Sequence, residues 1–160
     1  MNSINKFAND KEKTQRKKIE QLIHPTNYLP FFPEDDFSRT DGHIVNYFTD
    51  ERYSFESKWY GDIKNLRYSD KFPNYQIDYD KLSALEAKSI EDKSTPLLIC
   101  FFSNELVVWN INKCDWKSTK RKVYTNKIGG AYGQYKEWSE QAYLKLEDAI
   151  YRNPNITPFN

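Results

Sequence analysis

The chain has 160 residues, of which 38% are hydrophobic and 16% aromatic, so we expect residues 1–160 to form a single domain around one core. Charged residues make up 29%, yet the formal net charge is only +1, which excludes a globally basic nucleic-acid binder and allows only a local basic patch. The N-terminal residues are polar and no apolar run approaches a membrane span, so we expect a soluble, cytoplasmic protein without a signal peptide or membrane partner.

In chain order, the first predicted element is a helix over residues 8–23, which ends at His24-Pro25. Residues 25–41 contain three prolines and are expected to be an extended loop. Residues 43–48 are β-branched and aromatic, and residues 52–59 alternate strictly. The short segment between these two predicts a β-hairpin.

The second half begins with a polar loop over residues 60–75, followed by a helix over 79–92 capped by Asp78 or Asp80. Its core-facing residues are expected to be Leu82, Leu85 and Ile90. The apolar run 96–102 predicts a strand buried on both faces, and 105–111 predicts a second strand after a tight turn. A strand is also predicted near 121–125, and residues 137–150 fit either a helix or a strand. The expected fold is α/β, with a central mixed sheet flanked by helices.

The most informative segment is Asp41-Gly42 followed by Glu56-Ser57-Lys58. Residues i and i+2 of a strand share a face, so Glu56 and Lys58 project together while Phe55 points to the opposite side. A hairpin centred near Thr49-Asp50 places Asp41 across from this pair, within reach of one shared ion. The pattern therefore predicts a site made of two carboxylates and one ammonium group.

Two neighbouring carboxylates repel each other unless a divalent cation lies between them. Mg²⁺, or Mn²⁺ in its place, suits this site because it prefers oxygen ligands and needs few of them from the protein. We expect Asp41 and Glu56 to bind the metal, aided by the Ser57 carbonyl. Lys58 would stabilise negative charge on a phosphate, because its carboxylate neighbours keep it protonated.

Asp41, a strand, and then Phe55-Glu56-Ser57-Lys58 resemble the motif of the PD-(D/E)xK nuclease superfamily, which includes phage and restriction-endonuclease-like enzymes. The resemblance implies an αβββαβ core and Mg²⁺-dependent hydrolysis of DNA phosphodiester bonds by Asp41, Glu56 and Lys58. It also implies two accessory residues: Lys81 at the start of the second helix and Glu20 on the first. Thr40 stands where the motif usually has proline.

Each of these residues also has a structural interpretation. Asp41-Gly42 is a common turn pair, and Glu56 and Lys58 could form a solvent-facing ladder of opposite charges. Glu20 and Lys81 could be ordinary surface residues of helices. A second Glu-x-Lys, at residues 86–88, falls in a predicted helix and is interpreted as solvated surface.

DNA contacts are predicted for a basic stretch interleaved with aromatics, comprising Lys117, Lys120, Arg121 and Lys122. Arg39 could reach a phosphate, and Trp59 could stack on an unpaired base, although loop and packing roles are the alternatives. A homodimer is plausible because two copies can cut two strands. The alternatives to a nuclease are a catalytically inactive protein of the same fold that binds DNA or a protein partner, and a small interaction protein of unrelated fold.

Overall fold

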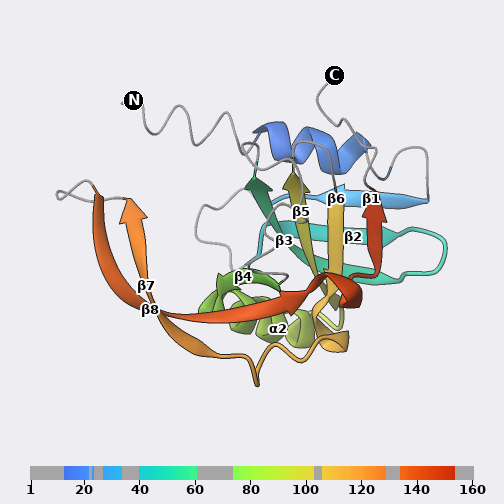
Figure 1. Ribbon diagram of the computed structural model, residues 1–160. Coiled ribbons are helices and arrows are strands. Elements are labelled where there is room, and N and C mark those ends of the chain that lie inside the picture. The colour runs from blue at the N-terminus through green and yellow to red at the C-terminus, as the bar shows by residue number, and fades with distance from the viewer. Residues whose placement is uncertain are drawn as a thin grey trace.

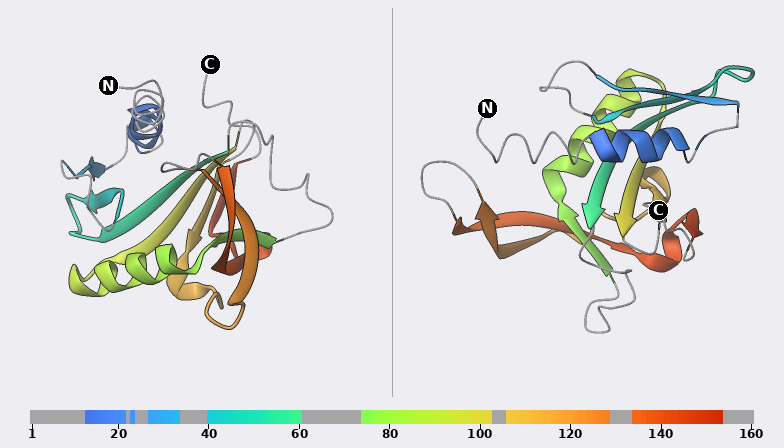
Figure 2. Two further views of the ribbon diagram at one scale, coloured as in Figure 1. Left: turned by 90° about the vertical axis from the view of Figure 1, so that its left-hand side faces the viewer. Right: turned by 90° about the horizontal axis from the view of Figure 1, so that it is seen from above.

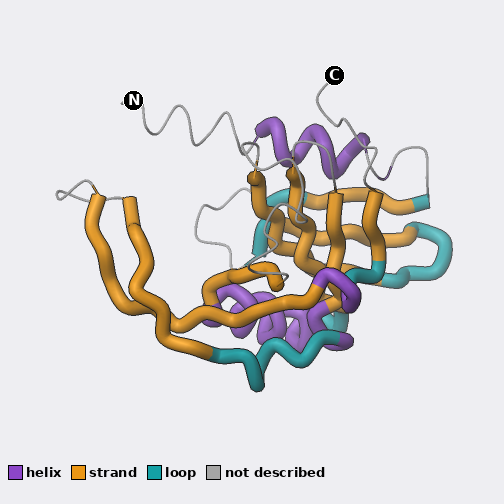
Figure 3. Tube along the Cα trace, in the orientation of Figure 1, coloured by secondary structure: helices purple, strands orange, loops and turns teal. Residues whose placement is uncertain are grey.

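The computed structural model describes residues 13–21, 23, 27–33, 40–60, 74–102, 106–128 and 134–153. Residues 13–21 and 23 are helical, and they form the N-terminal helix. Figures 1 and 3 show the remaining elements. They are β1 (Tyr28–Phe31), β2 (Gly42–Asn46), β3 (Arg52–Tyr60), β4 (Asn74–Asp78), α2 (Tyr79–Glu91), β5 (Thr95–Phe102), β6 (Leu106–Asn110), η2 (Ile111–Lys113), β7 (Arg121–Ile128), β8 (Gln134–Lys145), η4 (Leu146–Asp148) and β9 (Tyr151–Asn153). No helix in this part of the chain is long and apolar enough to cross a membrane.

The larger sheet has six strands in the order β1-β2-β3-β5-β6-β9. β3 and β5 are parallel, whereas the other neighbours are antiparallel. A parallel pair needs a long crossover, and α2 lies in the segment that joins β3 to β5. The order helix, β1-β2-β3, α2, β5 is the predicted αβββαβ order, with β4 inserted before α2. The predicted fold class, a mixed sheet flanked by helices, is confirmed.

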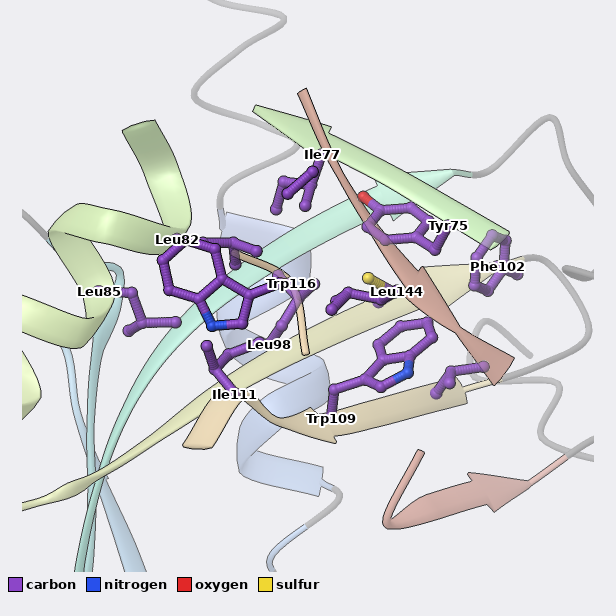
Figure 4. Close-up of a cluster of buried hydrophobic side chains, with 13 residues drawn as sticks. Tyr75, Ile77, Leu82, Leu85, Leu98, Phe102, Trp109, Ile111, Trp116 and Leu144 are labelled. Carbon is purple, nitrogen blue, oxygen red and sulfur yellow. The ribbon is translucent and has the colours of Figure 1, made fainter. Parts of the chain in front are cut away.

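The two helices lie on opposite faces of this sheet (Figure 2). On one face, Leu82 and Leu85 of α2 pack with Leu98, Trp109 and other buried side chains in the cluster drawn in Figure 4. On the other face, Ile19 of the N-terminal helix packs in a second cluster. β5 contributes alternate residues to both clusters, so its buried run reflects burial on two faces, as predicted.

A second sheet has three strands in the order β4-β8-β7. The inner part of β8, residues Gln141 to Lys145, pairs with β4, and its Ala142 and Leu144 join the core beside α2. The outer part pairs only with β7. These strands form a ribbon that projects from the body in both Figure 1 and Figure 2.

Local predictions differ from the structure in several places, and the structure also resolves one ambiguous segment. β1 occupies part of the expected loop at 25–41, because an edge strand tolerates Pro30. β4 was not predicted, and the ambiguous segment 137–150 lies largely in the strand β8. Ile90 is 72% exposed. Asp78 is the N-cap residue of α2 but makes no capping hydrogen bond, because its carboxylate accepts one from Gln141.

Candidate active site

Asp41 lies at the point where β3 extends beyond the end of its neighbouring strand β2. The register of β2 and β3 ends at Gly42 opposite Phe55, and β3 continues to Tyr60. The backbone N–H of Asp41 donates to the Phe55 carbonyl at 2.9 Å. Its carboxylate Oδ2 lies 2.7 Å from the Ser57 backbone nitrogen and accepts that N–H. The Asp41 side chain therefore continues the hydrogen-bond ladder of β3 beyond the end of β2.

Gly42 allows Asp41 to lie close to β3, because it has no side chain. A Cβ atom at this residue would lie 2.4 Å from the Phe31 carbonyl oxygen and 2.7 Å from Cζ of Phe55. Real Cβ contacts are essentially never that short, so β1 and the Phe55 ring could not both keep their places. The absence of a side chain thus lets the chain carry Asp41 close against β3.

Gln15 of the N-terminal helix joins the site from the opposite side of the sheet from α2. The Ser57 hydroxyl lies 2.9 Å from Gln15 Oε1 and 3.1 Å from Asp41 Oδ2. A cavity of about 30 Å³ lies between these groups, lined by Gln15, Arg16, Ile19, Phe32, Asp41, Phe55 and Ser57. That space is sufficient for a water molecule.

Glu56 and Lys58 share the face of β3 that looks toward α2. Glu56 is 5% exposed, and its Oε1 lies 3.2 Å from Lys58 Nζ and 3.5 Å from Lys81 Nζ. Lys81 reaches it from the first turns of α2. Strand alternation, fixed by the buried Phe55 ring, thus brings the acid and its neighbouring lysine together.

Burial raises the pKa of the Glu56 carboxyl above its usual value, and the negative charge of Asp41 raises it further. Lys58 and Lys81 act in the opposite direction but do not cancel these effects. The two carboxylates therefore interact electrostatically across the edge of β3. Their direct contacts differ, because Asp41 contacts Ser57 on the helix side whereas Glu56 contacts lysines on the α2 side.

The oxygen donors at this edge are of the chemical type that a hard divalent cation prefers. Within the described residues, the hydrogen bonds and ion pairs of the two carboxylates involve Asp41 Oδ2 and Glu56 Oε1, which leaves Oδ1 and Oε2 for another ligand. With the Ser57 carbonyl, these are oxygen donors, the type that Mg²⁺ prefers. In the same part of the chain, no group of three or more His, Cys, Asp or Glu side chains is arranged to hold a metal. A cation would therefore keep several waters.

The other predicted residues are distributed differently. Glu20 is exposed on the N-terminal helix, whereas Gln15 of that helix contacts Ser57. Lys117 and Lys120 each form an ion pair at 2.8 Å, with Glu86 and Glu140 respectively. Lys122 and Arg121 are exposed on β7, and Arg121 lies 5.9 Å from the centre of the Tyr143 ring. Arg39 and the side chain of Trp59 lie outside the described residues.

Sequence reasoning also missed a polar cluster at the other end of α2. His43 Nε2 lies 3.4 Å from Asp92 Oδ2, and its Nδ1 lies 3.2 Å from the Ser54 hydroxyl. Asp92, the C-cap residue of α2, also pairs with Lys88 at 3.2 Å. His43, Lys88 and Asp92 border a pocket of about 450 Å³. The only sequence signal was that Ser54 shares the alternating face of Glu56 and Lys58.

No family model and no curated protein matches the chain. Among solved structures, it is similar to Hjc, a Holliday junction resolvase from the archaeal hyperthermophile Archaeoglobus fulgidus. The TM-score is 0.47 and the sequence identity is 8%, with 79% of this chain and 86% of that chain covered. A similarity this low leaves the function to be argued from the chain's own side chains.

Proposed function

We propose that this protein is a metal-dependent nuclease of the PD-(D/E)xK type that hydrolyses phosphodiester bonds in DNA. The observation that carries the proposal is the buried Glu56 carboxylate, which contacts Lys58 and Lys81 and interacts electrostatically with Asp41. Burying a carboxylate beside a second carboxylate costs free energy. Carboxyl groups perturbed in this way cluster at functional sites.

In this proposal, Asp41 and Glu56, with the Ser57 carbonyl, hold Mg²⁺ or Mn²⁺. When bound, the cation polarises the phosphate and lowers the pKa of a water molecule. The Ser57 backbone N–H holds the Asp41 carboxylate in place by donating to its Oδ2. The Ser57 hydroxyl lies beside both Asp41 Oδ2 and Gln15 Oε1, which share its single proton. The orientation of Asp41 is therefore set before any ligand binds.

Lys58 is the residue that we assign to the phosphate. Its ammonium group lies beside Glu56 and its side chain is 29% exposed, so it is held in place but accessible. A positive charge in this position stabilises the negative charge that develops on the phosphate oxygens. Lys81, 51% exposed, adds a second positive charge at the same carboxylate.

A second candidate is a protein of the same fold that binds DNA without cutting it. It is favoured by the fact that Lys58 and Lys81 already balance the Glu56 charge, while Asp41 Oδ2 already accepts hydrogen bonds. A cleavage assay distinguishes the two candidate functions. Plasmid, linear and branched DNA are incubated with the wild-type protein in Mg²⁺, Mn²⁺ or EDTA. A nuclease cuts in the presence of metal, stops in EDTA, and loses activity in Glu56→Gln. Robust cutting by Glu56→Gln would exclude the assigned site.

A further inference from the structure

Among the residues that the structure describes, no third strand pairs with the ribbon formed by β7 and the outer part of β8. Its register runs from Arg121 opposite Gln141 to Ile128 opposite Gln134, whereas β4 pairs with β8 only from Gln141 inward. An isolated two-stranded ribbon buries little surface of its own. Several of its described side chains are exposed, including those of Lys122, Tyr124 and Trp138.

Tyr124 and Trp138 form a directly opposed cross-strand pair on this ribbon. Their rings lie 5.3 Å apart at 36°, and the residues are 53% and 68% exposed. Trp109 and Trp116, by contrast, are buried in the core. Such a pair stabilises a ribbon, but that role leaves the outer ring faces in water. A large exposed aromatic surface of this kind is typical of a binding site.

Positive charges flank the aromatic pair. By two-residue alternation, Lys122 and Lys136 lie on the same face of the ribbon as Tyr124 and Trp138. Lys136 Nζ lies 5.9 Å from the centre of the Tyr124 ring. Glu140, which lies opposite Lys122, is neutralised by an ion pair of 2.8 Å with Lys120. The face therefore combines an aromatic centre with positive charge on both sides.

We propose that this face binds an unpaired nucleotide of DNA, with the base stacked on the outer face of Trp138 and the neighbouring phosphates near Lys122 and Lys136. Because the two rings already contact each other, a base stacks on the pair and does not insert between the rings. The identification of the nucleic acid as DNA rests on the proposed nuclease function. The substrate then has a single-stranded or forked region, because both ring faces of a base inside a duplex are already stacked on the neighbouring bases. A second copy of the chain fits less well, since two positively charged faces repel each other.

The test measures binding in EDTA, where cleavage plays no part. Fluorescence anisotropy compares a single-stranded oligonucleotide, a forked duplex with unpaired arms, and a blunt duplex. Trp138→Leu keeps an apolar cross-strand contact but removes the ring. It should weaken binding to single-stranded and forked DNA about 5- to 150-fold and alter blunt-duplex binding less than about twofold. Trp138→Phe should restore most of the affinity.

The matched control is Phe48→Leu. Phe48 is 73% exposed and its ring lies 4.6 Å from that of Tyr47, so it belongs to a similar exposed pair on another part of the surface. This variant should bind all three DNAs like the wild type. Circular dichroism of each variant should match the wild type, since the ribbon keeps its apolar contact.

Three results would overturn the inference: an equal loss of blunt-duplex binding, unchanged single-strand binding in Trp138→Leu, or conversion of a dimer into a monomer by that variant in sedimentation. Cleavage in Mg²⁺ by the wild type and Glu56→Gln is measured separately. If the wild type cuts no DNA, the nuclease proposal fails, while the EDTA binding data still decide whether the ribbon recognises unpaired bases.

Discussion

The carboxylate of Asp41 accepts the backbone N–H of Ser57 with an N···O distance of 2.7 Å. This bond holds the carboxylate against β3 at the residue between Glu56 and Lys58. Asp41 therefore has two separable properties. Its Oδ2 atom accepts a hydrogen bond that extends the strand ladder, and its negative charge raises the pKa of Glu56.

Two substitutions separate these properties. Asp41→Asn keeps an acceptor oxygen but removes the charge, so it should retain the stability of the wild type and lose metal-dependent cleavage. Asp41→Ala also leaves the buried Ser57 N–H without its acceptor and should lower the free energy of unfolding by about 1–3 kcal/mol. Urea denaturation and a cleavage assay measure the two effects. Equal stability of the two variants would contradict this assignment of the hydrogen bond.

The two lysines at Glu56 should contribute unequally. Lys58→Met removes the half-buried ammonium group that we assign to the phosphate, and it should lower kcat by about 100- to 1000-fold. Lys81→Met removes a more exposed charge and should lower it on the order of tenfold. Lys88→Met, further along α2 and paired with Asp92, is the control and should cut at a nearly wild-type rate. A larger loss in Lys88→Met than in Lys58→Met would argue against the assigned role of Lys58.

Gln15 and Glu20 provide a matched comparison on the N-terminal helix. Gln15→Ala removes an acceptor of the Ser57 hydroxyl and should weaken Mg²⁺ binding about 10- to 100-fold, because groups that orient metal ligands have effects of this size. Glu20→Ala, at an exposed position, should bind the metal like the wild type. Isothermal titration calorimetry distinguishes the two, and the reverse ranking would restore Glu20 as the accessory residue.

Gly42→Ala tests whether the close approach at the start of β2 positions Asp41. The new Cβ would overlap the Phe31 carbonyl and the Phe55 ring, so we expect a loss of about 1–3 kcal/mol in unfolding free energy together with reduced cleavage. Asp41→Asn should lose only the activity. A Gly42→Ala protein with wild-type stability and cleavage would show that the approach is not needed.

Because Lys18 is buried, we predict that the stability of the protein depends on pH. Burial lowers the pKa of the Lys18 side chain from 10.5 to about 7. The unfolded chain therefore holds more protons than the folded chain between these two values, and the contribution of this group to stability increases as the pH rises through that window. Lys18→Met should raise the melting temperature most below pH 7, and the gain should shrink toward pH 10.5. The exposed neighbour variant Lys17→Met should show no such trend. A gain for Lys18→Met that is constant with pH would contradict the prediction.

The part of the site that could be predicted from the sequence is the part that follows from strand periodicity. Alternation around Phe55 predicted that Glu56 and Lys58 share a face, as they do in the structure. Lys81, which only the resemblance to the nuclease superfamily implied, contacts Glu56. Gln15 could not be identified because the face that a polar helix turns toward the sheet depends on tertiary packing. Glu20 was chosen for its charge, which gives no information about that orientation.

The remaining differences come from long-range pairing. β1 contains Pro30 and β4 follows a polar segment, so neither carries a strong local strand signal, and each is held by a partner strand elsewhere in the chain. The contact of Asp41 with Ser57 depends on the register at Gly42 and Phe55. Hairpin length alone suggested a diagonal neighbour across the strands, whereas the structure has a direct hydrogen bond.

Helix α2 is anchored near both of its ends to polar side chains of the larger sheet: Lys81 contacts Glu56, and Asp92 contacts His43. A helix of 13 residues behaves as a stiff rod, so a tilt or slide that moves one anchor also moves the other. Any molecule that enters the pocket beside His43 and shifts Asp92 would therefore change the position of an ammonium group at the carboxylate of Glu56. The two ends of the helix are therefore mechanically linked, although only the Asp92 end borders the pocket beside His43.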